Sequence, residues 1–272
     1  MKVAIQGIQG SFHHIVAENF YSKDIELLEC MTFSEMPMHL QEGRVDALVM
    51  AIENSIAGAI LPNYALIDKY DLKIVGEYYL SIHQNLMALP GQTIDDIKEV
   101  CSHPMALLQC GEFFEKHTHI KLIEDKDTAE VAKRINDNQL KGVGAIASTR
   151  AADIYNLEVL APEIQTIKQN QTRFFILEKR DTTKNLEANK ASLKFTASHQ
   201  AGSLGRILEV FGNNNVSLTK IQSMPVIDTP WKYSFFADVT FENYAEYAKS
   251  LEGINYLVET IKVLGEYTRS NK

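Results

Sequence analysis

The sequence has few of the residues that several classes of site require. Only three of its 272 residues are cysteines, Cys30, Cys101 and Cys110. No C-x-x-C pair and no cysteine–histidine spacing of the zinc-binding kind occurs, so we expect reduced thiols and no metal site. Cys101 and Cys110 lack the neighbouring groups that activate a nucleophile, and we expect both to be buried and inert.

Long apolar runs and an excess of positive charge are also missing. The first residues are Met1-Lys2-Val3-Ala4-Ile5, and the sequence shows neither an export signal pattern nor an apolar stretch of membrane-spanning length. We therefore expect a cytoplasmic protein with no membrane partner. The net charge of −8 argues against nucleic acid as a partner. It does not exclude a small anion, which one arginine and a few backbone amides can hold.

What is present indicates one medium α/β domain followed by a small one. Hydrophobic residues make up 45% of the chain and charged residues 23%, a composition that allows packed cores. Strand-like runs alternate with helical patterns, which predicts largely parallel pairing. The predicted strands are 2–6, 25–28, 47–52, 73–89, 121–123, 143–147 and 173–177. The predicted helices begin near residue 12 and cover 36–41 (with a capping box of Thr32 and Glu35), 105–117 and 127–138.

A polar, non-periodic run at residues 179–185 is the candidate linker. The order beyond it is strand, helix, strand, strand, helix, strand. These elements are predicted at 192–198, 203–212, 216–222, 232–240, 244–251 and 256–264. This βαββαβ order is that of a ferredoxin-like module, with helices on one face of the sheet. Such modules often associate through strand edges or helices, so we expect a dimer.

Four segments place polar residues at predicted strand ends or helix starts, where open α/β sheets bind ligands. They are GIQGSF at 7–12, AIENSIAG at 51–58, CSHPMALLQC at 101–110 and NQTRFFIL at 170–177. In the first, two glycines let backbone amides approach a ligand, and the helix start at Ser11 favours an anion. A plain tight turn is the alternative. The segment is not a dinucleotide fingerprint, because the third glycine is absent.

The other three segments are ambiguous when each is taken alone. Asn54 and Ser55 could cap a helix or form a ligand shelf. Ser102 and His103 could cap the helix that Pro104 opens, and His103 could also act as a general base. Arg173 enters a strand flanked by aromatic residues, where an unpaired charge would be costly, so we expect it to contact a carboxylate.

Taken together and in this order, the four segments resemble the motifs of the prephenate dehydratase family. Those motifs are Gly-Pro-x-Gly-Thr-Phe/Tyr, Pro-Ile-Glu-Asn-Ser-x-x-Gly, Ser-His-Pro-Gln-Ala-Leu-x-Gln-Cys and Asn-x-Thr-Arg-Phe, and the resemblance extends over essentially the whole chain. The sequence departs from them at Ile8, Ser11, Ala51 and Met105. Ser11 keeps the hydroxyl of the usual threonine, whereas Met105 removes a polar contact.

The C-terminal module resembles an ACT domain, a small-molecule sensor fused to many amino-acid enzymes. Residues 199–204 resemble its Pro-Gly-Ala-Leu turn and residues 220–225 its Ile-Glu-Ser-Arg-Pro strand, although Gln222 and Met224 replace the two charged residues. The resemblance implies L-phenylalanine as effector, with a purely structural dimerisation module as the alternative. The implied effector-binding residues are Gly202, Ser203, Leu204, Gln222, Ser223 and Pro225.

The resemblance also implies the domain organisation. Residues 1–180 would form a two-lobed catalytic domain like a type II periplasmic binding protein, with the active site between the lobes. One lobe would comprise residues 1–76 and 161–180, and the other residues 77–160. Residues 191–272 would form the ACT domain, and the protein would be a homodimer or homotetramer.

The activity implied is loss of water and carbon dioxide from prephenate to give phenylpyruvate, or the same reaction on arogenate. Aromatisation drives it, so no cofactor is expected. A non-catalytic sensor is disfavoured because Thr172, the implied proton donor, and Arg173, the implied carboxylate clamp, are both present. The implied substrate-binding residues are Ser11, Asn54, Ser55, Ser102, His103, Asn170 and Phe174. The implied structural residues near the site are Glu53, Gly58 and Gln109.

Overall fold

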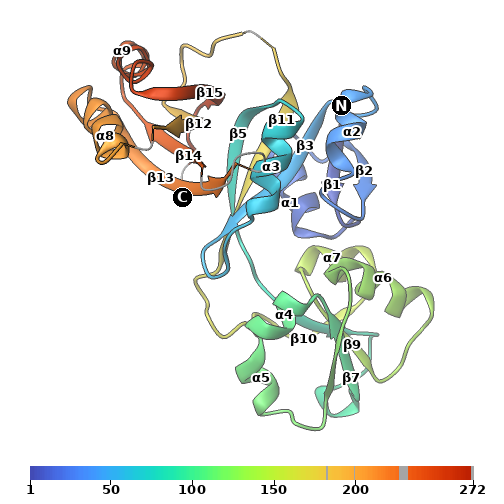
Figure 1. Cartoon of the computed structure of the whole chain (residues 1–272). Coiled ribbons are helices and arrows are strands. Elements are labelled where there is room, and N and C mark those ends of the chain that lie inside the picture. The colour runs from blue at the N-terminus through green and yellow to red at the C-terminus, as the bar shows by residue number, and fades with distance from the viewer. Residues whose placement is uncertain (182, 199, 227–231, 271–272) are drawn as a thin grey trace. The chain divides into compact units, whose positions relative to one another are not determined.

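The computed structural model describes residues 1–181, 183–198, 200–226 and 232–270. The chain forms two compact units, and its helices and strands are labelled in Figure 1. The N-terminal unit comprises residues 1–59 and 78–174, and the C-terminal unit residues 60–77 and 175–272. The predicted domain boundary between residues 180 and 191 stays a prediction.

The first sheet has the strand order β2-β1-β3-β11-β5, and a short strand β4 pairs with β3. Its strands are β1 (Lys2–Gln6), β2 (Glu26–Cys30), β3 (Ala47–Asn54), β4 (Gly58–Ala59), β5 (Leu72–Ser81) and β11 (Gln171–Lys179). β1 runs parallel to both β2 and β3, as predicted. Residues 47–52 of β3 are buried and the next two are only half-buried, so the strand ends abruptly in polar residues.

Between β1 and β5 in the sequence lie the helices α1 (Phe12–Phe20), α2 (Met36–Gln41) and α3 (Leu61–Lys69). The Ser11 hydroxyl caps α1 by accepting the amide of His14 at 3.2 Å, which confirms the predicted cap. The predicted capping box of α2 is wrong. Glu35 is itself the N-cap residue. The Thr32 hydroxyl donates to the Glu35 carboxylate instead of accepting a backbone amide. No signal in the sequence had identified α3.

The second sheet has the order β10-β6-β9-β7-β8. Its strands are β6 (Asn85–Ala88), β7 (Glu99–Ser102), β8 (Lys121–Glu124), β9 (Val143–Ala147) and β10 (Glu158–Ala161). β7 is parallel to β8 and β9, whereas β6 is antiparallel to β9 and β10, so the expected parallel pairing holds for only part of this sheet. The predicted strand 73–89 is in fact β5 and β6. They are separated where the Ile82 amide donates to the Asn170 carbonyl.

Five helical segments accompany the second sheet: η1 (Ile94–Asp96), α4 (Pro104–Gln109), α5 (Gly111–Glu115), α6 (Thr128–Asp137) and α7 (Thr149–Ile154). The single helix predicted at 105–117 is wrong, because Cys110 has non-helical dihedral angles and divides it into α4 and α5. The helix predicted at 127–138 is confirmed as α6. Asp127 caps it by accepting the amides of Ala129 and Glu130, each at 2.9 Å.

The loop after β1 packs directly on α7. Ile8 belongs to the same buried apolar cluster as Ala151 and Ala152. The Ser148 hydroxyl donates to the Gly10 carbonyl at 2.6 Å. Gly10 has a φ of +88°, and a Cβ there would lie 2.9 Å from the Cα of Ala151, so both conformation and space require glycine.

The C-terminal module is an antiparallel sheet of order β13-β14-β12-β15. Its strands are β12 (Lys190–Ala197), β13 (Ser217–Pro225), β14 (Tyr233–Thr240) and β15 (Val258–Tyr267). The helices α8 (Ser203–Asn213) and α9 (Tyr244–Ile254) lie side by side and share one apolar core with the sheet (Figure 1). The predicted βαββαβ order, and with it the predicted fold class of α/β lobes followed by a ferredoxin-like module, is confirmed.

Charged side chains fasten this module to the other segments of the C-terminal unit. Lys190 of β12 donates to both carboxylate oxygens of Glu77 in β5, at 2.9 and 2.8 Å, and these side chains are 7% and 0% exposed. Arg180, inside the predicted linker, donates to Asp71 at 2.7 Å and to the Val263 carbonyl at 3.1 Å. The linker is therefore anchored at this residue. Thr182, also in that run, lies outside the described residues.

Candidate active site and regulatory module

Three of the motif segments meet in a set of four hydrogen-bonded side chains, Asn54, Gln109, Asn170 and Thr172, which we call the amide cluster. The Asn54 amide nitrogen lies 2.7 Å from Asn170 Oδ1 and 3.0 Å from Thr172 Oγ1. Asn170 in turn donates to Gln109 Oε1 at 3.0 Å. The end of β3, the start of β11 and the end of α4 are thus joined by neutral groups.

Asn54 also shapes the loop that follows it. Its Oδ1 accepts the amides of Ile56 and Ala57, each at 2.9 Å. This arrangement identifies the oxygen and the nitrogen of the side chain, because only the nitrogen can donate to the amide cluster. The helix-cap alternative is wrong, because a turn and β4 follow Asn54 and its side chain organises that turn. The ligand-shelf alternative stays a prediction.

Thr172 and Arg173 lie at the start of β11 and are almost fully buried, at 9% and 4% exposure. Because Thr172 Oγ1 accepts from Asn54, its hydroxyl hydrogen can point to another acceptor. The Arg173 guanidinium lies 5.8 Å from the ring centre of Tyr79, a cation–π distance. Phe174, the next residue, is 1% exposed and its ring contacts His13 edge-on.

Ser55, Glu53 and Gly58 surround this strand end. The Ser55 amide donates to the Gln171 carbonyl at 2.8 Å, and the Gln171 amide donates to Ser55 Oγ at 3.0 Å. Glu53 and Asn54 pair with Ala59 and Gly58 in the β3–β4 hairpin. Gly58 has a φ of +82°, which explains a glycine at this turn.

The loop of the first motif has a carboxylate beside it that the sequence analysis missed. A Cβ on Gly7, whose φ is +86°, would lie 2.6 Å from Asp127 Oδ2 and 3.2 Å from Ser11 Cβ. Asp127 is 7% exposed, and burial raises the pKa of its carboxyl group. As a helix cap, Asp127 had an ordinary explanation in the sequence. Only the fold brings it to the loop.

Ser102 and His103 are not members of the amide cluster. Ser102 is fully buried and its hydroxyl donates to the Ile146 carbonyl at 2.8 Å. His103 is exposed and caps α4, with Nδ1 accepting the Met105 amide at 3.2 Å. The capping alternative for His103 is therefore confirmed. The hydrogen bonds described above do not join either residue to the amide cluster.

Two adjacent buried histidines on α1, His13 and His14, were not expected from the sequence. His13 Nε2 accepts the Ala51 amide at 3.3 Å, and His14 Nδ1 accepts the Gly10 amide at 2.9 Å. Burial lowers the pKa of both, that of His13 to about 3. A pair of histidines in an amphipathic helix has no distinctive pattern, so no sequence signal would have separated them from ordinary helix residues.

The predicted effector-binding residues lie on two elements of the C-terminal module. Gly202, with a φ of +78°, precedes α8, and the buried Ser203 hydroxyl donates to the Ser198 carbonyl at 2.6 Å. His199, in the same motif, lies outside the described residues. Leu204 packs partly against the module core. On β13, Gln222 is half-buried and donates to the Ser223 carbonyl at 3.0 Å, whereas Ser223 and Pro225 are exposed.

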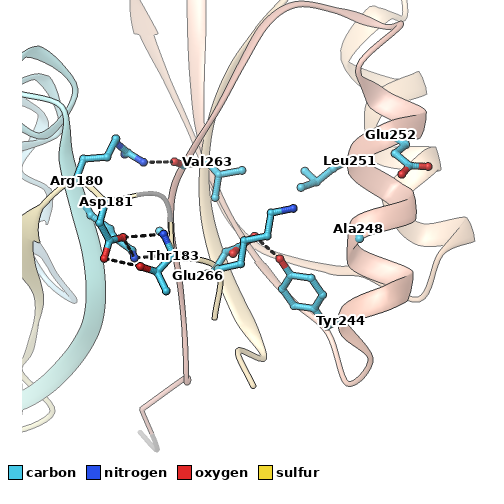
Figure 2. A pocket seen from close by; sticks show the side chains of 12 residues that line it. Arg180, Asp181, Thr183, Tyr244, Ala248, Leu251, Glu252, Val263 and Glu266 are labelled. Atoms are coloured by element: carbon cyan, nitrogen blue, oxygen red, sulfur yellow. Dashed lines mark hydrogen bonds and ion pairs between the residues drawn. The ribbon is translucent and has the colours of Figure 1, made fainter. Parts of the chain in front are cut away.

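A pocket of about 360 Å³ in the C-terminal unit contains none of these effector-motif residues. It lies between the linker, α9 and β15, and Figure 2 shows the Tyr244 hydroxyl directed at Glu266, to which it donates at 3.1 Å. Its lining carries charges of both signs, and the linker residues Asp181 and Thr183 are hydrogen-bonded to each other. The pocket therefore lies between the linker and α9, and the side chains that line it have no net excess of one charge.

The three thiols are buried, as expected from the sequence. Cys30, Cys101 and Cys110 are free and buried, and burial raises their pKa values, that of Cys110 to about 12. Within the described ranges, no three His, Cys, Asp or Glu side chains gather as a metal site would require. In the same part of the chain, no helix is both long and apolar enough to cross a membrane.

A comparison with protein-family models decides the family. The model described as prephenate dehydratase matches residues 3–182. The chain belongs to the prephenate dehydratase family. It is therefore a dehydratase of the prephenate or arogenate type, and it carries a further module beyond the matched residues.

Two curated relatives match nearly the whole chain. Arogenate dehydratase 2 of Petunia hybrida is 36% identical over 98% of this chain and 71% of its own length. The bifunctional chorismate mutase/prephenate dehydratase of Aquifex aeolicus is 32% identical over 99% of this chain and 74% of its own length. Identity to relatives with either substrate name is similar, so family membership leaves the substrate open.

Solved structures resemble the chain over both units. One described as a novel type of quorum quenching acylase has a TM-score of 0.89 and 26% identity, covering 99% of this chain and 98% of that chain. The prephenate dehydratase of Arthrobacter aurescens in complex with L-Phe has a TM-score of 0.86 and 24% identity, covering 99% and 90%. The second likeness bears on the fold alone.

Proposed function

We propose that the protein is a prephenate dehydratase that converts prephenate into phenylpyruvate, water and carbon dioxide. The observation that carries the proposal is the Asn54–Thr172 hydrogen bond. It occupies the threonine oxygen and leaves the hydroxyl hydrogen to donate, beside a buried arginine. A hydroxyl that already accepts a hydrogen bond is a stronger donor, because such bonds polarise one another.

In this proposal Thr172 donates to the ring hydroxyl of the substrate as that group departs. The carbon–oxygen bond breaks as the bond to the ring carboxylate breaks, and the electron pair of the latter enters the ring. The hydroxyl leaves with the electron pair of its bond, takes the Thr172 proton and departs as water, while the carboxylate departs as carbon dioxide. Thr172 then regains one proton from solvent. Threonine is a weak acid, so its contribution depends on position and on a site of low polarity. Exclusion of water would also favour loss of the carboxylate.

Charge complementarity assigns the remaining groups. Arg173 would hold a substrate carboxylate through two parallel hydrogen bonds. Ser11, Asn54, Ser55, Ser102, His103, Asn170 and Phe174 would line or orient the substrate. Glu53 would shape the β3–β4 turn, since a second carboxylate facing a dianion would repel it. In the proposed organisation, residues 1–180 carry out the chemistry and residues 191–272 form the ACT domain.

Two other activities can be tested against this site. Arogenate carries an amino group where prephenate has a keto oxygen, and the name of the Petunia relative makes it the second candidate. An acylase, the activity ascribed to one of the similar solved structures, needs a base that activates its nucleophile. Thr172 is paired with the amide nitrogen of Asn54, which cannot accept a proton, and so the cluster favours a donor role.

L-phenylalanine is the proposed effector of the C-terminal module, because the βαββαβ order and residues 199–204 and 220–225 resemble an ACT domain. Gly202, Ser203, Leu204, Gln222, Ser223 and Pro225 would form the site, in a homodimer or homotetramer. Gln222 is neutral and already bonded to the Ser223 carbonyl. Binding of the ligand's ammonium group there would be weaker than binding by a carboxylate.

The deciding experiment measures product formation by purified protein from prephenate and, separately, from arogenate, each with and without L-phenylalanine. We expect kcat/KM to be higher for prephenate, and added L-phenylalanine to change the rate. A higher value for arogenate would replace the substrate assignment. Turnover of neither substrate would overturn the proposed function, and an unchanged rate with L-phenylalanine would leave the module with a structural role.

A further inference from the structure

The buried pair His13 and His14 links segments that the proposed mechanism needs. Both side chains are almost completely buried, at 8% and 5% exposure. Each accepts a hydrogen bond from a backbone amide, His13 from Ala51 and His14 from Gly10. Adjacent residues on a helix point about 100° apart, so the two rings reach different neighbours from one turn of α1.

His14 holds the glycine loop from one side, and Ser148, the N-cap residue of α7, holds it from the other. Gly10 donates its amide to His14 Nδ1, and its carbonyl accepts from Ser148 Oγ at 2.6 Å. His14 Nε2 lies 3.2 Å from Glu18 Oε1, and Arg150 donates to the same oxygen at 2.6 Å. Since Nδ1 accepts, the ring proton must be on Nε2, and the Glu18–Arg150 pair keeps it there.

His13 joins two other motif segments. Its Nε2 accepts the Ala51 amide at 3.3 Å, three residues before Asn54 in β3. Its ring meets that of Phe174 edge-on, at 5.0 Å between centres and an interplanar angle of 88°. Phe174 follows Thr172 and Arg173 in β11, and so His13 contacts both strands that supply the amide cluster.

We propose that His13 and His14 are positioning residues, neutral hydrogen-bond acceptors that hold the Gly10 loop, the end of β3 and the start of β11 in the geometry required for turnover. Neither ring needs to touch the substrate. The effect on turnover rests on the proposed function, whereas the effect on the two backbone amides does not.

A protonated histidine cannot accept a hydrogen bond. His13 and His14 can therefore hold the two backbone amides only while both rings are neutral. The charged groups that face His14 are Glu18, Arg150 and Glu29, and burial is the largest influence on its pKa, which it lowers. His13 packs against Phe33 and Phe174, and burial alone accounts for its lowered pKa. Turnover should therefore decline as the pH falls through the pKa of His14, below the ordinary histidine value of about 6.5.

Reciprocal substitutions test the geometry, because the two rings accept through different nitrogens. Asparagine places its oxygen near Nδ1 and glutamine places its oxygen near Nε2. His14→Asn and His13→Gln are thus the matched variants, and His14→Gln and His13→Asn are the mismatched controls. We expect the matched variants to keep kcat/KM within about threefold and the mismatched ones to lose about 10- to 100-fold. His14→Asn, which does not titrate, should also move the acid limb of the pH profile to lower pH.

Amide hydrogen exchange supplies a readout that is independent of activity. Protection at Gly10 should survive in His14→Asn and fall in His14→Gln, and protection at Ala51 should survive in His13→Gln and fall in His13→Asn. If the wild type turned over neither substrate, the proposed function would fail while exchange still tested the histidines. Equal effects of asparagine and glutamine at each position, or protection unchanged in the mismatched variants, would overturn the proposal.

Discussion

The amide cluster of the N-terminal unit is built from neutral side chains, whereas the C-terminal unit buries charges. Asn54, Gln109, Asn170 and Thr172 share hydrogen bonds of 2.7 to 3.0 Å with no charged member. The Lys190–Glu77 pair consists of two charged side chains and is buried more deeply than Asn54 and Gln109, which are half-buried. Ser192 adds a second buried polar contact there, with Asp238 and Tyr267.

The difference fits the role proposed for each region. A neutral cluster can exchange one hydrogen bond for a ligand contact without exposing a bare charge. A buried ion pair resists separation, because either partner alone would be a charge out of water. The first arrangement suits a site that binds and releases molecules. The second suits two strands, β5 and β12, that stay together.

The strongest test of the neutral cluster is removal of its donor. Thr172→Ala should lower kcat by about 10²- to 10⁴-fold, the usual contribution of a positioned proton donor. Thr172→Ser, which keeps the hydroxyl, should retain most of the activity. Steady-state kinetics of both variants, with thermal unfolding to confirm the fold, make the measurement. Equal activity of the alanine and serine variants would remove Thr172 from the mechanism.

Removing one partner of the Lys190–Glu77 pair should destabilise the protein more than replacing both partners with apolar residues. Lys190→Met alone should lower the free energy of unfolding by about 3–5 kcal/mol, because it leaves Glu77 buried without its cation. Adding Glu77→Leu should recover much of that loss. Denaturant unfolding of both single variants and the double variant measures the coupling. Additive losses would mean that the pair does not join the two strands.

A substitution at Asn54 separates the donor role of its side-chain nitrogen from the acceptor role of its side-chain oxygen. Asn54→Asp keeps the oxygen that holds the Ile56 and Ala57 amides but removes the donor to Thr172. Thr172 would then donate to the new carboxylate and could not donate to substrate. We expect a fall of about 10- to 100-fold in kcat with a loss of stability of only about 1 kcal/mol. Kinetics unchanged in Asn54→Asp would contradict the donor assignment.

The last test concerns the acid stability that His13 confers. The pKa of His13 is about 3 in the folded protein and near 6.5 when unfolded, so the unfolded state binds more protons between these values. The contribution of His13 to the free energy of unfolding should be constant above pH 6.5. Below pH 6.5 it should fall by about 1.4 kcal/mol per pH unit. Urea unfolding from pH 4 to 8 should show a shallower acid slope in His13→Gln. An identical slope would exclude His13 as the source.

Local sequence patterns were sufficient for most elements and for the motif segments. The abrupt polar end of β3, the capping Ser11 and the βαββαβ order depend on neighbouring residues, and the structure has all of them. Patterns failed where long-range contacts overrode them. The run 73–89 looked continuous but divides between two sheets, and α3 had no distinctive periodicity.

The sequence by itself determined which residues carry polar chemistry and in which order the strands and helices follow. Tertiary structure alone decided which of those residues meet. Asn54 and Thr172 are 118 positions apart and Glu77 and Lys190 are 113 apart. The acceptor roles of His13 and His14 and the approach of Asp127 to Gly7 likewise depend on packing. The physical reason is that a capping or strand-end signal needs only adjacent residues, whereas these contacts form only when distant segments are buried together.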